Sequence, residues 1–199
     1  MAQIETATEL RSLYGEATIL AQKKNLDHID GHARAFIERS PFVVLSTADA
    51  AGWPDSSPRG DPPGFLTVEG PHTLLLPDRP GNKRVDSFNN VISNPKVGLL
   101  FLVPGHSHSL RVNGTARLLS DEGLCKRFAV QGKAALAVLE VTALECSFIV
   151  ASRSSALGSG SRRNGPIEPV SRVLEARWWM SASGHSRCFG ASAGSLPNA

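Results

Sequence analysis

Short runs of β-forming residues recur along the middle of this chain, and turn-forming residues separate them. The first run, Phe42–Thr47, directly follows Ser40 and Pro41, and the residue before a proline is pushed out of the helical region. Similar runs follow at residues 65–68, 73–77, 97–103, 109–119 and 138–148. Short strands at this spacing are typical of barrels, so we expect an α+β fold with a mainly antiparallel barrel.

Helical patterns flank and interrupt these runs. Apolar residues recur near a 3.6-residue period across residues 5–39, and Gly15 is expected to divide this segment into two N-terminal helices. Two further helices are expected at residues 83–92 and 121–130. Asp121 is suited to cap the second of these, because its carboxylate can accept the free N–H groups of the first turn.

The composition changes abruptly after Phe148. Residues 149–199 contain 11 Ser, six Gly and six Arg but no Lys, and show no sustained period. Taken alone, this composition predicts a disordered C-terminal tail. The chain therefore divides into an N-terminal helical segment (1–39), a barrel (40–148) and an atypical low-complexity tail (149–199).

Charge and composition narrow the functional classes. The formal net charge is +3, but residues 1–148 have a balance of −1 and the tail one of +4. The barrel is therefore near neutral and only 6% of residues are aromatic, which argues against a nucleic-acid partner. No apolar run reaches the roughly 18 residues of a membrane span and no leader pattern is present, so we expect no membrane partner and a cytoplasmic protein. The three cysteines are widely spaced, and free thiols are expected.

The segment Pro77–Arg84 is a candidate anion site. It follows a predicted strand and precedes a predicted helix, and helix N-termini present unpaired N–H groups to anions. Gly81 allows close approach of the backbone, and Lys83 and Arg84 add two positive charges. The alternative interpretation is a polar loop with solvated cations.

A second candidate segment, Asp55–Gly64, contains three prolines and two glycines and should form a stiff loop. Within it, Arg59 lies between Ser57 and Asp61, a set suited to a polar heterocycle or a ribityl chain. The alternative is an ordinary rigid connection.

Other features are weaker. Two histidines, His106 and His108, lack a third ligand nearby, so we expect no metal site. Arg111 alternates with apolar residues on a predicted strand and faces either ligand or solvent. No catalytic motif was recognised, so no catalytic residue is assigned.

Taken together, the two candidate segments resemble a subgroup of the pyridoxamine 5′-phosphate oxidase-like, FMN-binding split-barrel family. The resemblance runs from about Ile4 to Phe148. It includes the motifs Ser57–Gly64 and Pro77–Arg84, and also Ser93–Phe101 and Leu110–Gly114. Motifs of this length in one order are specific to the family, though not to one reaction.

The resemblance implies a six-stranded split barrel that forms a homodimer and holds FMN in a groove shared by both subunits. It makes Lys83 and Arg84 ligands of the FMN phosphate and Asn82 a further contact. It places Ser57, Arg59 and Asp61 near the ribityl chain or the ring, and Arg111 is added to this cofactor set. Some split barrels hold haem or a deazaflavin instead of FMN, and these motifs leave that alternative open.

The leading functional hypothesis is an FMN-dependent oxidoreductase that exchanges a hydride or electron pair with a small-molecule substrate or a nicotinamide donor. The alternative is a non-catalytic FMN-binding or flavin-storage protein, since no acid/base constellation is recognised. The apolar run Leu99–Val103 should be buried on both faces, one of them against the partner of a homodimer.

The tail departs from the family pattern. A His-Cys-x-Lys-type continuation is expected after Phe148, whereas this chain has Ile149–Ser152. We therefore predict that residues 149–199 are the product of a shifted reading frame. Restoring one base after the Phe148 codon permits codons for His-Cys-Ser-Lys, although the degeneracy permits many other readings. Such a change would leave the edge of the barrel open, which is a hazard for aggregation.

Overall fold

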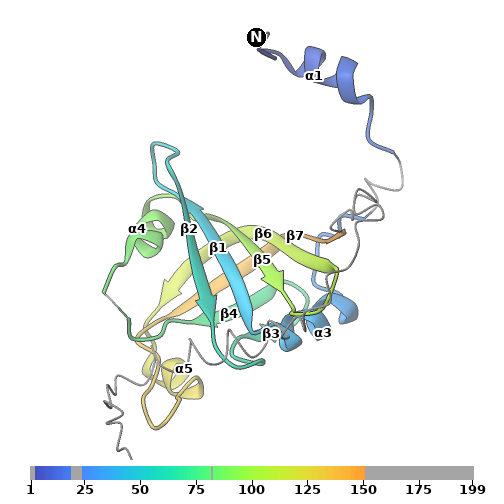
Figure 1. Cartoon of the computed structure of the whole chain (residues 1–199). Coiled ribbons are helices and arrows are strands. Elements are labelled where there is room, and N and C mark those ends of the chain that lie inside the picture. Colours follow the sequence, from blue (N-terminus) through green and yellow to red (C-terminus); the bar gives the residue numbers. More distant parts are fainter. Residues whose placement is uncertain (1–2, 19–23, 82, 151–199) are drawn as a thin grey trace, which may run out of the picture. The chain divides into compact units, whose positions relative to one another are not determined.

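The computed structural model describes residues 3–18, 24–81 and 83–150, and its centre is one antiparallel sheet. The order of the strands is β2-β1-β5-β6-β7-β4-β3, and no pairing between β2 and β3 closes the sheet within these residues. The sheet curls around a core, with helices at its ends (Figure 1). The strands are β1 (Phe42–Ala48), β2 (Pro54–Gly60), β3 (Thr67–Glu69), β4 (Thr73–Pro77), β5 (Lys96–Leu102), β6 (His108–Leu119) and β7 (Val138–Val150). The predicted α+β split barrel is confirmed, with seven strands in the described sheet in place of the six that the resemblance implied.

Alternation along the strands separates the two faces of the sheet. On β1 the side chains of Val43 and Leu45 are fully buried, and on β5 Leu99 and Phe101 are equally buried. The intervening residues Phe42, Val44 and Leu100 are only half-buried, and Leu102 is exposed. One face of β1 and β5 thus forms the core, while the other is partly covered. One face of Leu99–Val103 is thus buried in the core as predicted, and the predicted burial of the other face against a partner subunit stays a prediction.

Strand β2 corrects the sequence analysis, which assigned Asp55–Gly64 to a loop. Residues 54–60 pair with β1 over its full length, from Phe42 opposite Gly60 to Ala48 opposite Pro54. Two prolines are tolerated because β2 is an edge strand, where an N–H is not needed on the outer side. The polar composition of residues 54–60 shows none of the β-branched or aromatic residues that predict a strand.

Strand β7 extends further than expected. The predicted run ended at Phe148, but Ile149 pairs with Ser109 and Val150 with His108, so the strand continues for two residues into the segment assigned to the tail. The predicted disordered, frame-shifted tail otherwise lies outside the described residues. So does Cys188, whereas Cys125 and Cys146 are buried free thiols.

The helices are shorter than predicted. Helix α1 (Ala7–Tyr14) ends at Gly15, whose φ of 69° is in the left-handed region, and α3 (Gly31–Arg39) follows. Residues 24–30 are not helical, because the backbone of Leu26 both donates to and accepts from the backbone of Cys146 on β7. Helix α5 (Glu122–Arg127) is capped by Asp121 as expected, but ends before Phe128.

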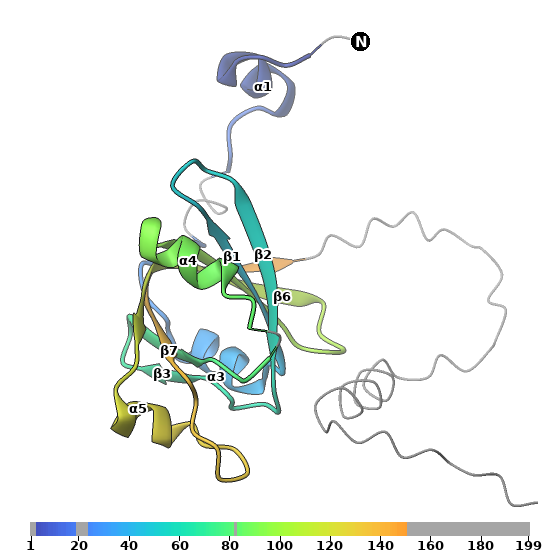
Figure 2. The ribbon, with the colours of Figure 1, turned by 90° about the vertical axis from the view of Figure 1, so that its left-hand side faces the viewer.

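Helix α4 (Asp86–Ser93) begins three residues after the predicted start at Lys83. It packs on β1, β2 and β6, and Figure 2 shows it lying across the strands of the β1–β2 hairpin. Lys83 has a φ of 62°, which is incompatible with a helical first turn. Within the described residues, no helix is long and apolar enough to cross a membrane.

Candidate functional site

Two crossed ion pairs join the two motifs that the sequence singled out. Arg59 at the end of β2 donates from Nη1 to Oδ1 of Asp78 at 2.9 Å, and Arg79 donates from Nε to Oδ2 of Asp61 at 2.8 Å. All four side chains are at least 70% buried, with exposed fractions between 16% and 27%. Each motif supplies one cation and one anion, so the four charges cancel. The end of β2 is therefore fastened to the end of β4 at this site.

Arg59 also contacts an aromatic ring. Its guanidinium carbon lies 5.1 Å from the centroid of the Phe88 ring on α4, a cation–π distance. Its Nε is buried and has no hydrogen-bond partner among the described residues. A buried donor without an acceptor costs about 1–3 kcal/mol, so an unpaired guanidinium nitrogen in a folded protein points to an absent acceptor.

The neighbouring carboxyl of Asp78 is perturbed by its surroundings. Burial raises the pKa of Asp78 above its ordinary value, while Arg59 and then Arg79 act in the opposite direction. The backbone N–H of Asp78 donates to the carbonyl of Ala137, which fixes the start of the loop after β4. Asp78 is thus held in place from both its backbone and its side chain.

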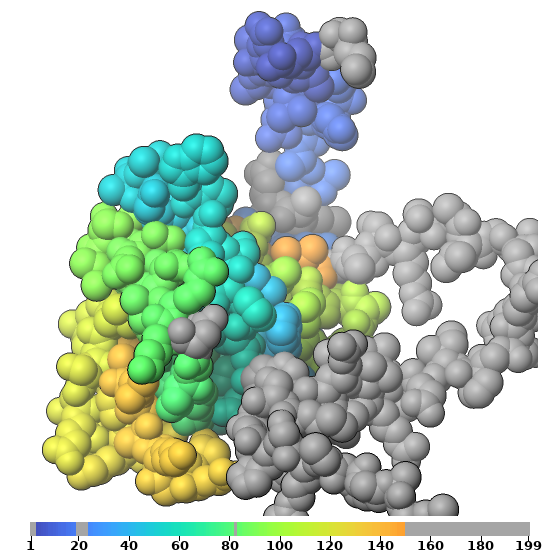
Figure 3. Space-filling model, turned by 60° about the vertical axis from the view of Figure 1, so that its left-hand side comes forward, coloured from blue at the N-terminus to red at the C-terminus, as the bar shows by residue number. Residues whose placement is uncertain are grey.

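The other end of this loop is anchored to β2 and β1 through α4. Ser87 donates its hydroxyl to Oδ2 of Asp55 at 2.6 Å, and Asn90 donates to Oγ1 of Thr47 at 3.0 Å. In Figure 3 the green surface of α4 and its preceding loop lies beside the teal surface of β2. Residues 77–87 are therefore tied to β2 at both ends.

Between these anchors lie the basic residues of the predicted anion site. Lys83 is exposed and makes no hydrogen bond or ion pair with the described residues. Arg84 is exposed and pairs with Asp86 at the start of α4, with 2.8 Å between Nη2 and Oδ2. Asn82 lies outside the described residues. The helix contributes less than expected, because Lys83 and Arg84 precede its first turn.

Ser57 and Arg59 project from the same face of β2. Their partners on β1 are Leu45 and Val43, both fully buried, so this is the core side of the sheet. Arg111 belongs to the other face, because it pairs with Leu100, the neighbour of Phe101. The structure therefore groups Ser57, Arg59 and Asp61 with the loop after β4 and separates Arg111 from them.

Arg111 is part of a second polar cluster, on the outer face of β6 and β7. Its Nη2 donates to Oε1 of Glu145 at 2.8 Å, and Asn113 donates to Oε2 at 3.0 Å. The hydrogen bond from Asn113 lowers the pKa of Glu145, burial opposes this, and the charge of Arg111 lowers it further. Arg111 Nε and the hydroxyl of Ser147, opposite it in the register, are buried without a partner in the described chain.

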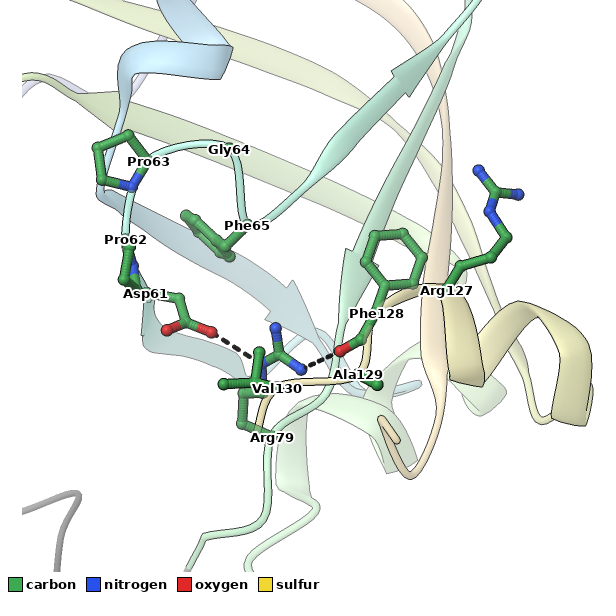
Figure 4. A pocket seen from close by; sticks show the side chains of 10 residues that line it. All are labelled: Asp61, Pro62, Pro63, Gly64, Phe65, Arg79, Arg127, Phe128, Ala129 and Val130. Atoms are coloured by element: carbon green, nitrogen blue, oxygen red, sulfur yellow. Dashed lines mark hydrogen bonds and ion pairs between the residues drawn. The ribbon is translucent and has the colours of Figure 1, made fainter. Parts of the chain in front are cut away.

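A shallow pocket of about 270 Å³ is lined in part by Asp61 and Arg79. Figure 4 shows Arg79 at its base, with Nε directed to Asp61 and Nη1 to the carbonyl of Phe128 at 2.5 Å. The walls are the Pro62–Phe65 loop and residues 127–130. Arg79 thus ties the loop after β2 to the end of α5.

Sequence reasoning missed three residues here, namely Asp78, Arg79 and Phe88. Asp78 and Arg79 lie inside the Pro77–Arg84 motif, but their partners become visible only in the structure, where the ends of β2 and β4 lie close together. Among the described residues, no group of histidines, cysteines or carboxylates is arranged to hold a metal ion. What the site offers chemically is a guanidinium group held in place by its contacts, with the exposed ammonium of Lys83 nearby in the chain, a combination suited to an oxyanion.

Comparison with known proteins agrees with this architecture. The family model described as pyridoxamine 5′-phosphate oxidase matches residues 29–150. HupZ of Group A Streptococcus has a similar structure, with a TM-score of 0.51 and 16% identity over 62% of this chain and 95% of that one. A variant of HupZ gives a TM-score of 0.51 and 17% identity over 61% and 99% of the two chains.

An FMN-binding protein from Syntrophomonas wolfei has a TM-score of 0.46 and 16% identity, over 61% of this chain and 86% of that one. No curated protein matches the chain. At these identities the two HupZ structures establish the fold alone. The family match covers more than half of the 199 residues. The chain therefore belongs to the pyridoxamine 5′-phosphate oxidase family.

Proposed function

We propose that this protein binds FMN through its phosphate group and acts as an oxidoreductase on a small-molecule substrate or a nicotinamide donor. The observation that supports this most directly is the buried Nε of Arg59, a guanidinium donor without an acceptor in the described chain. When bound, the flavin supplies the redox chemistry, and the protein supplies binding and orientation.

The residues present fit a phosphate. The four charges of the crossed ion pairs cancel, and Lys83 and Arg84 add two cations beside the carboxylates of Asp86 and Asp55. Lys83 makes no ion pair with the described residues, so its charge is available to an anion, and Arg59 offers the geometry that matches two phosphate oxygens. In this proposal Lys83, Arg84 and Arg59 bind the phosphate, and Ser57 and Asn82 contact the adjacent ribityl chain.

Two residues of the expected cofactor set have another role or position in the proposal. Asp61 is engaged by Arg79, so it supports the fold at the end of β2 and is not a ligand of the cofactor. Arg111 projects from the opposite face of the sheet, and a role for it in cofactor binding requires a ligand that reaches the outer face.

The test is a flavin titration of the purified full-length chain. The bound protein should show the two flavin absorption bands, and FMN should bind more tightly than riboflavin, which lacks the phosphate. Equal dissociation constants for the two flavins, or no binding of either, would reject the proposal.

A non-catalytic flavin-binding protein is the second candidate. It is favoured by the state of the carboxyl groups in the site, because Asp55, Asp61 and Asp78 each accept a hydrogen bond from the described chain. No uncommitted general acid or base is thus available among these three residues. Oxidation of NADH or NADPH by the FMN-loaded protein with an added electron acceptor separates the candidates, since storage alone predicts no turnover.

We further propose that the protein is a homodimer that pairs through the outer face of the sheet. On this face Phe42, Val44 and Leu100 are half-buried, while Leu102 and Ile149 are 39% and 37% exposed. Exposed apolar side chains gathered on one sheet face are typical of interaction surfaces. Sedimentation of a flavin-loaded monomer at micromolar concentration would contradict the dimer.

A further inference from the structure

We propose that Asp78 and Phe88 are positioning residues, which hold the guanidinium of Arg59 so that the fork of its Nε and Nη2 groups faces a bound phosphate monoester. This inference rests on the proposed FMN function and assigns a role to two residues outside the predicted cofactor set.

The contact with Asp78 determines which edge of the guanidinium stays available. Arg59 uses Nη1 for the carboxylate, at 2.9 Å. A guanidinium has a second edge, formed by Nε and the N–H of Nη2 beside it, and that edge binds two oxygens of a phosphate or carboxylate at once. The buried Nε without an acceptor belongs to this edge. The ion pair therefore occupies one side of Arg59 and leaves the bidentate side for a ligand.

Phe88 restricts the remaining freedom of the side chain. The guanidinium carbon of Arg59 is 5.1 Å from the ring centroid, and the half-buried ring comes from α4. Asp78 comes from the end of β4, so the two contacts reach Arg59 from different elements. Two supports from different elements reduce the rotamer freedom that an arginine otherwise loses on binding a ligand.

The carboxylate of Asp78 does not compete with the ligand for the same nitrogens. Burial and the two arginines act on its pKa in opposite directions, and Asp61 and Arg79 are the other charged groups of the cluster. Because the charges of the cluster cancel, Arg59 orients the phosphate through its hydrogen bonds more than it attracts it by net charge. The net attraction comes from Lys83 and Arg84. Loss of Asp78 should consequently reduce affinity through misorientation, even though it removes a negative charge from an anion site.

The experiment measures the FMN preference, defined as the dissociation constant of riboflavin divided by that of FMN. The wild-type value tests the proposed function, and the variants test the positioning roles. Asp78→Ala removes the acceptor, whereas Asp78→Asn keeps an oxygen that can accept from Nη1. We expect Asp78→Ala to lower the preference by about tenfold, the scale of one charge-assisted contact, and Asp78→Asn to retain most of it.

Two further variants keep the test decisive if Asp78→Ala folds poorly. Arg59→Lys retains the charge but has no fork, and Phe88→Leu retains an apolar side chain but no ring. Both should lower the FMN preference, and riboflavin affinity should change little. Glu140→Ala is the matched control, because Glu140 on β7 is also a largely buried carboxylate, 20% exposed, paired with an arginine, Arg117.

The proposal is overturned if Asp78→Ala increases FMN affinity, which would identify Asp78 as a competitor. It is also overturned if Asp78→Asn loses as much as Asp78→Ala, or if Arg59→Lys keeps the wild-type preference. A wild-type protein that binds both flavins equally would instead reject the proposed function itself.

Discussion

Arg59 and Arg79 occupy similar positions in the crossed ion pairs but make different use of their donors. Both arginine side chains are largely buried, with 21% and 27% exposed, and each contacts one carboxylate. Arg79 directs Nε to Asp61 and Nη1 to the carbonyl of Phe128. Arg59 directs Nη1 to Asp78 and leaves a buried Nε without an acceptor in the described chain.

The difference separates an arginine that connects parts of the fold from one prepared for a ligand. Arg79 donates only to groups of the protein, and it links Asp61, directly after β2, to Phe128 at the end of α5. Arg59 has the same charge and a comparable burial, but its hydrogen bonding is incomplete. A buried donor is rarely left unpaired without a functional reason. Charge and burial alone would not have distinguished the two residues.

The largest expected effect is on flavin binding, in the variant Arg59→Leu. It removes a bidentate charge-assisted contact, and we expect FMN affinity to fall by about 100-fold, while riboflavin affinity falls far less. Titration followed by flavin fluorescence measures both constants. If the affinities for FMN and riboflavin fall by the same factor, Arg59 stabilises the fold as Arg79 does and does not contact the phosphate.

The reciprocal variant, Arg79→Leu, should act on stability. It leaves the largely buried carboxylate of Asp61 without its partner and removes a hydrogen bond to Phe128, at a cost of about 2 kcal/mol. For a domain of this size the melting temperature should fall by about 4–8 °C. The FMN preference of the folded fraction should stay near the wild-type value. Unchanged stability together with a lost preference would reverse the two assignments.

The sequence predicts some strands of the sheet and not others. The strands from Phe42 onward were predictable because β-branched and aromatic runs alternate with turn residues. Strand β2 was not, because Pro54–Gly60 is polar and its strand geometry comes from pairing with β1. A strand at an edge can lack every local sign of a strand when its neighbour supplies the hydrogen bonds.

Within the candidate site, the two motifs were predictable and their connection was not. Arg59 and Asp78 are 19 residues apart, and Arg79 and Asp61 are 18 apart. Their strands, β2 and β4, lie near opposite edges of the sheet, so only the curling of the sheet brings them together. The predicted helix start at Lys83 was wrong, since Lys83 adopts a positive φ that a helix cannot contain. The basic pair thus lies in a loop, where its orientation depends on the anchors at both ends.

A smaller effect on binding is expected when both exposed cations of that loop are removed. In Lys83→Ala/Arg84→Ala the phosphate loses two charges, but exposed contacts are worth less than buried ones, so we expect about a tenfold loss for FMN. The loss should shrink as salt is raised, unlike the loss in Arg59→Leu, because salt screens exposed charges first. Equal losses for riboflavin and FMN would show that these residues do not contact the phosphate.

The smallest expected effect concerns the pH dependence of stability through Asp78. Burial raises its folded pKa above the ordinary value of 3.8, so the folded state binds this proton more tightly than the unfolded state does. The resulting stabilisation is complete below the unfolded pKa and is lost as the pH rises through the folded pKa. Asp78→Asn removes this titration. The free energy of unfolding of the variant relative to wild type should therefore increase from acidic to neutral pH, measured by urea denaturation.

Glu145→Gln provides a control of opposite sign. Hydrogen bonds and the charge of Arg111 lower the folded pKa of Glu145, so its contribution is present above the unfolded pKa and is lost as the pH falls through the folded pKa. The stability of this variant relative to wild type should decrease from acidic to neutral pH. Parallel slopes for the two variants would mean that Arg59 outweighs burial at Asp78. In that case the ion pair itself would stabilise the fold, and Arg59 would resemble Arg79 more closely than its unpaired Nε indicates.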